Sequence, residues 1–192
     1  MMPKRSSESI MFAQFLYEED LVSVTFLRQL QPISAGGAQI GPFEEGKEGK
    51  IPLWVAKALE ADGAVKINWE EGSLKPSELY KLSWKEEKNE GISQLPKHFY
   101  PKLRALLSAL NEAIKKNPTH TLLNEQRQSI MKAQDLINCR LQKILRLAME
   151  RNPSKALTEA LEPEERALYS AIRSEIDDWR LKLLSEETKR GE

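Results

Sequence analysis

Histidine, cysteine and clustered carboxylates are the side chains with which this 192-residue chain could do chemistry. It has two histidines and one cysteine. His98 and His120 have no second histidine or carboxylate at the spacing of a helical metal site. Cys139 has Arg140 beside it but no partner histidine that would make it a nucleophile. We therefore expect no catalytic residue, no metal site and no cofactor.

Phosphate binding is the other chemistry to consider. The glycines between positions 36 and 49 are not followed by the Lys-Ser/Thr pair of a phosphate loop, so they are interpreted as turns. Arg140, Lys143 and Arg146 concentrate positive charge near the end of a long predicted helix, where cations also stabilise the helix C-terminus. These three residues are candidate nucleic-acid contacts, although we favour the structural interpretation because stacking aromatics are not interleaved with them.

Composition argues against a broad electrostatic attraction to nucleic acid. Lys plus Arg and Asp plus Glu both number 29, so no global positive field is expected. No window approaches the roughly 20 apolar residues of a membrane helix, and the N-terminus lacks the apolar core and cleavage site of a signal peptide. With a single cysteine, these features predict a cytoplasmic protein with no membrane partner.

The first part of the chain predicts a small β-rich domain. Residues 8–17 have helical spacing and predict a short N-terminal helix. Residues 21–27 and 65–69 alternate apolar and polar side chains, which is typical of strands. Between them, a helix is expected to open at Ile51 with Pro52 near its first position and to close at Gly63.

Beyond residue 72 the helical period dominates. Helices are predicted from Pro76 to Asn89, over the leucine stripe of residues 103–114, from Thr119 to Arg151, and after Pro163. The expected fold class is therefore α+β, with a small β-rich domain at residues 1–72 and a larger all-α helical bundle at residues 73–192.

The longest predicted helix has more apolar surface than one contact in a small bundle would cover. This excess predicts an interface with a partner protein. The candidate interface residues, from this helix and the last one, are Leu123, Ile130, Ile137, Leu141, Ile144, Trp179 and Leu183.

The four tryptophans are expected to serve as core or interface anchors rather than as platforms for stacked bases. Three of them, Trp54, Trp69 and Trp179, sit in apolar periodic runs, which favours packing. Trp84 is the exception, because it lies among Lys81, Ser83 and Lys85.

The order of several motifs resembles the GINS family of replication proteins. Phe15-Leu16 and the segment from Glu19 to Val24 resemble the opening of a GINS small domain. Gly41-Pro42-Phe43 and Pro52-Leu53-Trp54 are similar to the family's Gly-Pro-Phe and Pro-Leu-Trp signatures. Leu95-Pro96 with Phe99-Tyr100, and the Arg140 to Leu145 segment, resemble two further family elements. The resemblance covers roughly residues 10–150 and implies structural roles for its motif residues: Gly41, Pro42, Phe43, Pro52, Trp54, Phe99 and Tyr100.

The domain order is similar to that of the second and third eukaryotic GINS subunits, and the short loops favour an archaeal protein. The resemblance implies a non-catalytic subunit that joins a complementary GINS subunit in a 2:2 heterotetramer through its helical domain. It also implies contacts with the MCM helicase and a RecJ-like partner, with DNA polymerase or primase as further candidates, at nucleoid-associated replication forks. Binding of the active helicase ring in preference to the inactive one would stimulate unwinding.

Two alternatives stay open at this point. A single-stranded nucleic-acid-binding accessory module would use the cations near Arg140 and Arg146, and its binding would weaken steeply with salt. An enzyme whose site forms only at a subunit interface is disfavoured by the shortage of histidine and cysteine.

Overall fold

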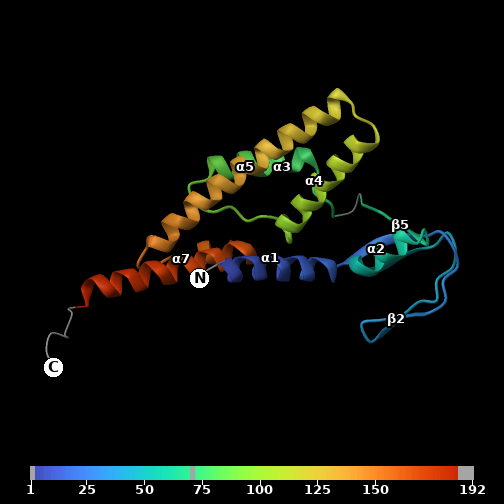
Figure 1. Cartoon of the computed structure of the whole chain (residues 1–192), viewed down its shortest axis with the longest axis horizontal. Helices are drawn as coiled ribbons and strands as arrows, with labels where there is room; N and C mark the ends of the chain where they lie inside the picture. Colours follow the sequence, from blue (N-terminus) through green and yellow to red (C-terminus); the bar gives the residue numbers. More distant parts are fainter. Residues whose placement is uncertain (1–2, 70–71, 186–192) are drawn as a thin grey trace. The chain divides into compact units, whose positions relative to one another are not determined.

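The structure is a computed structural model that describes residues 3–69 and 72–185. The chain divides into two compact units (Figure 1). The small unit comprises Met11–Ser73, and the helical unit takes in the chain from Leu74 onward and the segment before Met11. Strands are confined to the first unit and long helices dominate the second, which confirms the predicted α+β class.

The small unit is built on a three-stranded antiparallel sheet in the order β4-β1-β5. A separate hairpin pairs β2 with β3 around Gly36 and Gly37, which both have the positive φ that glycine tolerates. The elements up to residue 67 are α1 (Pro3–Glu18), β1 (Leu21–Phe26), β2 (Ile33–Ala35), β3 (Ala38–Ile40), β4 (Glu48–Pro52), α2 (Leu53–Ala61) and β5 (Val65–Ile67).

Strand β1 forms where the sequence alternates. Val24 and Phe26 are fully buried, and the Phe26 ring stacks on Phe43 with centroids 3.9 Å apart. Gly49 on the neighbouring strand makes this packing possible, because a Cβ there would lie 2.9 Å from the Phe26 ring. The Gly41-Pro42 peptide bond is cis and precedes Phe43 directly.

Strand β4 corrects the prediction that a helix opens at Ile51. Ile51 pairs with Val22 and Pro52 with Leu21, and α2 begins only at Leu53. Pro52 has an extended ψ of 140°, which matches a strand end rather than a helical turn. Sequence patterning missed this strand because Glu, Gly and Lys are poor strand formers and only their pairing with β1 holds them extended.

The helical unit is organised around α5, which packs against α3, α4 and α7 (Figure 1). The Thr119 hydroxyl accepts a hydrogen bond from the Leu122 amide and caps the start of α5. A short helix that the sequence did not predict follows α5. The elements are α3 (Pro76–Lys88), α4 (Phe99–Lys116), α5 (His120–Met149), α6 (Lys155–Glu159) and α7 (Pro163–Leu184). Within the described ranges, no helix combines the length and apolarity needed to cross a membrane.

Candidate functional site

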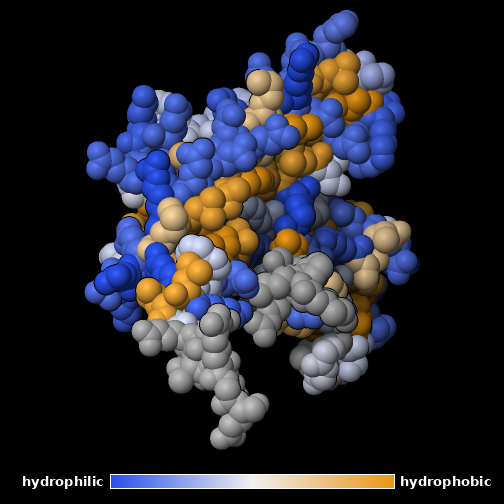
Figure 2. Space-filling model, turned by 60° about the vertical axis from the view of Figure 1, so that its left-hand side comes forward, coloured by the Kyte–Doolittle hydropathy of each residue, from blue (hydrophilic) through white to orange (hydrophobic). Residues whose placement is uncertain are grey.

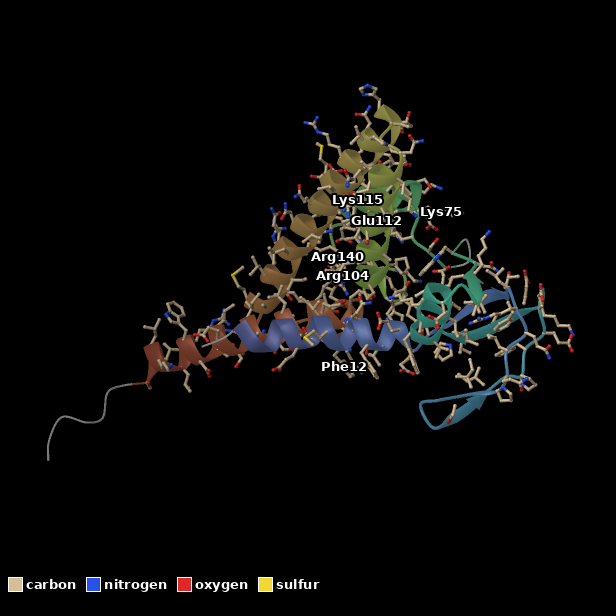
Figure 3. The ribbon with its side chains drawn as sticks, turned by 45° about the vertical axis from the view of Figure 1, so that its right-hand side comes forward. Phe12, Lys75, Arg104, Glu112, Lys115 and Arg140 are labelled. Atoms are coloured by element: carbon tan, nitrogen blue, oxygen red, sulfur yellow. The ribbon has the colours of Figure 1, made fainter. Side chains whose placement is uncertain are left out.

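Arg140 is the largest fully buried side chain of the helical unit and lies on the inward face of α5 (Figure 3). Its Nε and Nη2 donate to the two carboxylate oxygens of Glu165 on α7, at 2.5 and 2.6 Å. Its Nη1 donates to Glu86 on α3 at 2.9 Å and to the Ser93 carbonyl at 2.7 Å. One guanidinium therefore joins three helices and a loop through charge-assisted bonds.

The two carboxylates have further donors of their own. Glu86 accepts from the Ser93 amide, the Ser93 hydroxyl and the Lys143 ammonium. Glu165 accepts from the Tyr100 hydroxyl at 2.6 Å. Because both buried carboxylates are multiply hydrogen-bonded, the Arg140 network meets the condition under which buried charge is tolerated.

Electrostatics inside the network favour the charged forms. Burial by itself raises the pKa of Glu86, but hydrogen bonds from Lys143 and Ser93 and the charge of Arg140 outweigh burial and lower that pKa. Burial and the neighbouring Glu165 carboxylate raise the pKa of Tyr100, so its hydroxyl stays a donor. Burial opposes the charge of Arg140, yet Glu165 and Glu86 raise the pKa of the guanidinium.

This geometry corrects the suggestion that Arg140, Lys143 and Arg146 contact nucleic acid together. Arg140 is buried, and the Lys143 ammonium donates to Glu86 and to the Asn89 carbonyl at 2.6 and 2.7 Å. The N–H donors of both cations are used in internal hydrogen bonds, so none is left to bind a phosphate. Arg146 alone of the three is exposed.

An apolar stripe runs along the outer face of α5. Its residues recur at spacings of four and seven, which place them on one side of a helix. The α5 stripe consists of Leu123, Ile130, Ile137 and Leu141, which are 36–44% exposed. Figure 2 shows a hydrophobic band rising diagonally between hydrophilic side chains. Ile144 was predicted to belong here, but it is 2% exposed and packs with Ile92 and Leu161 in the core.

The two residues predicted on α7 are also exposed. Trp179 is 61% and Leu183 64% exposed, and their separation of four residues places them on one face. Leu181 and Leu184 nearby are exposed as well. The end of α7 therefore presents a second apolar surface, which we call the α7 end.

The remaining motif residues differ in burial. Phe99 is fully buried in a core with Leu79 and Leu103, and its ring meets Tyr100 edge-on at 5.2 Å. Trp54, in the small unit, is 37% exposed. Within residues 3–69 and 72–185, no group of three or more His, Cys, Asp or Glu side chains could hold a metal ion.

Sequence reasoning missed both acidic partners of Arg140. Glu86 shares one side of α3 with Leu79 and Leu82, and a carboxylate on an apolar stripe is the signal that could have indicated a buried partner. Glu165 lies in the first turn of α7, where a carboxylate can complement the helix dipole. It does so, since its side chain accepts from the Glu162 amide at 3.0 Å, but it also binds Arg140.

Comparisons with known proteins identify the family. Residues 73–184 match the family described as Sld5, the GINS complex protein helical bundle domain. A Caenorhabditis elegans protein named "Probable DNA replication complex GINS protein PSF2" is 32% identical over 73 residues. That match covers 36% of this chain and 38% of the relative, so it spans less than half of the relative's length.

Proposed function

This chain belongs to the family of GINS complex proteins, and we propose that it is a non-catalytic structural subunit of such a complex. The observation that carries the proposal is the α5 stripe, an ordered row of large apolar side chains left exposed on the longest helix. Apolar rows of this kind on a packed helix mark interaction surfaces. We propose that a complementary GINS subunit covers the α5 stripe and the α7 end.

The energetics support a subunit contact. Completing the burial of each α5-stripe side chain would contribute about 1 kcal/mol, given that full burial of Leu or Ile is worth roughly 1.5–3 kcal/mol. The stripe residues Leu123, Ile130, Ile137 and Leu141 could thus anchor an interface of ordinary strength together with Trp179, because aromatic residues are favoured anchors.

The Arg140 network supports this role in a different way. By joining α3, α5 and α7 through a single guanidinium, it fixes the helices that present both apolar surfaces. A surface that is ordered before binding loses less conformational entropy when the partner docks. In this account the buried charges serve a scaffold rather than a reaction.

The wider activity follows from the family and is part of the proposal. A 2:2 heterotetramer with the complementary subunit would bind and activate the MCM helicase and link it to a RecJ-like partner, with DNA polymerase or primase as further candidates. It would act in an archaeal cytoplasm, at replication forks. Stimulation would arise from tighter binding to the active ring arrangement; equal binding to both arrangements by a complex that still stimulates unwinding would contradict this mechanism.

Direct contact with DNA is proposed to be weak. Of the three candidate nucleic-acid contacts, Arg140 and Lys143 bind internal acceptors. DNA binding that is tight enough to account for function, and that weakens steeply as salt is added, would contradict this part of the proposal.

The test is co-purification of the tagged complementary GINS subunit with variants of this chain. Ile130→Glu places a charge in the α5 stripe at a position that is already 39% exposed, so the chain is expected to fold and to lose the partner. Met131→Glu is the matched control, because it makes the same change one residue later, on a side chain that lines a different surface of α5. Retention of the partner by folded Ile130→Glu, or equal loss by both variants, would refute the assignment.

A further inference from the structure

A second exposed surface lies between α3 and α5 and is separate from the α5 stripe. It is a groove of about 330 Å³ lined by three residues from each helix. We call it the α3–α5 groove; its residues are Tyr80, Trp84, Glu87, Gln128, Met131 and Lys132. Successive helical residues are turned by about 100°, so Met131 faces the groove while its neighbour Ile130 faces the stripe.

The groove leaves a large apolar surface uncovered. Trp84 is 63% and Met131 55% exposed. Tryptophan is the most favoured anchor residue of protein interfaces, and methionine adapts its shape to inserted side chains. The volume suits one bulky apolar side chain rather than a folded domain, which matches recognition of a short segment.

The charges around the groove are unequal. On α3, Lys81 and Lys88 lie three residues before and four residues after Trp84, on its face of the helix. Both are exposed, and no ion pair is seen for either among the described residues. The pKa of the Lys132 ammonium is raised mainly by its hydrogen bond to Asp135, and also by the groove's own acidic side chain, Glu87, which lies close to it.

On α5, Lys132 donates to Asp135 at 2.9 Å, and Arg127 stands exposed one turn before Met131. Lys81, Lys88 and Arg127 then stand against two carboxylates, Glu87 in the groove and Glu125 one turn before Gln128. A surplus of one positive charge remains, and it is concentrated at the two lysines on the face of Trp84. A partner complementary to this surface carries an apolar side chain between acidic residues.

We propose that the α3–α5 groove is a docking site for an acidic segment of a partner protein, which inserts one bulky apolar side chain beside Trp84. This docking does not depend on the assembly proposed above, because the groove and the α5 stripe are on different faces of the helix. Single-stranded nucleic acid fits less well, because strands bind along successive aromatic platforms in a positively charged groove, whereas this groove exposes one large ring, that of Trp84.

Fluorine NMR of the full-length chain tests the proposal. Incorporation of 5-fluorotryptophan gives one signal for each of the four tryptophans, and Trp→Phe variants assign them. The probe is a short synthetic peptide with one phenylalanine between aspartates and glutamates. We expect the Trp84 signal to shift during titration while the Trp179 signal stays in place, although Trp179 is equally exposed at 61%.

Variants separate the apolar contribution from the electrostatic one. Trp84→Ala is expected to weaken peptide binding about tenfold or more, as for loss of a central aromatic anchor, while Trp179→Ala leaves binding unchanged. The double variant Lys81→Glu, Lys88→Glu is expected to weaken it about threefold to tenfold, from two exposed charge pairs. Helical circular dichroism identifies any variant that fails to fold.

Three results would overturn the proposal. One is a peptide that binds without moving the Trp84 signal, or that does not bind at all. Another is a peptide with lysines in place of its acidic residues that binds as tightly as the acidic one. The third is an oligothymidine strand that shifts Trp84 when the acidic peptide does not, which would make the groove a nucleic-acid site instead.

Discussion

Replacing Arg140 with methionine removes the guanidinium while keeping an apolar side chain of similar length in the core. Glu165 then loses both of its bonds from Arg140, at 2.5 and 2.6 Å, and retains the Tyr100 hydroxyl. Glu86 loses one bond but keeps Lys143 and Ser93. The lost ion-pair bonds are therefore mainly those of Glu165, which becomes a buried carboxylate with no cation.

Breaking a buried pair by removing one partner costs roughly 3–5 kcal/mol. We expect Arg140→Met to lie within this range, because Glu165 is almost fully buried and carries two of the three ion-pair bonds that are lost. Domains of this kind are stable by roughly 5–15 kcal/mol. The loss would therefore be a large fraction of the free energy of unfolding of the helical unit.

The assay is urea unfolding followed by circular dichroism at a helical wavelength. Arg146→Met is the matched control, since it removes the same charge from an exposed position on the same helix and should change stability by no more than about 0.5 kcal/mol. Combining Arg140→Met with Glu165→Gln removes the stranded charge, keeps an acceptor for the Tyr100 hydroxyl and leaves the Glu86–Lys143 pair intact, so it should restore much of the lost stability.

Equal midpoints for wild type, Arg140→Met and Arg146→Met would refute the reasoning, because a buried carboxylate left without a cation has to be costly. A double variant less stable than Arg140→Met alone would also contradict it. That result would mean that the Glu165 carboxylate stabilises the unit without Arg140.

Two further predictions concern the small unit and the pH dependence of stability. Gly49→Ala should destabilise the small unit by about 1–3 kcal/mol, because the new Cβ would lie 2.9 Å from the buried Phe26 ring; urea titration of the β1 amide signals measures this, and an unchanged midpoint would contradict it. The folded state lowers the pKa of Glu86 below its ordinary value of 4.5, so the stability that this carboxylate contributes is present above that pH and is lost as pH falls through the lowered pKa. The stability difference between wild type and Glu86→Gln should accordingly be largest near neutral pH and shrink below about pH 4, whereas a difference independent of pH would refute the assignment.

Periodicity predicted most of the fold because most elements bury one regular face. The stripe on α4 and the alternation on β1 are local patterns, and both elements formed where these patterns lie. Strand β4 was not predicted because its extended conformation depends on pairing with β1, which is a long-range interaction. The short helix α6 has no buried residue and offers no periodic face to detect.

The candidate site was only partly predictable. Arg140 was noticed as a cation, but charge alone does not distinguish a solvated arginine from a buried one. That distinction depends on Glu86 and Glu165, which are 54 and 25 residues away in the chain. Ile144 shares the seven-residue repeat of Ile137, yet it packs inward, because α6 and α7 add neighbours that no pattern within α5 can indicate.

The central claim is that this chain is a structural subunit that needs a partner for its apolar surfaces. The most direct measurement is the solution mass of the chain, alone and co-expressed with the complementary GINS subunit of the same source, by light scattering after size exclusion. The account predicts a defined species with two copies of each chain in the co-expression, and a chain that self-associates increasingly as its concentration rises when the partner is left out. A well-behaved monomer that ignores the partner would contradict it.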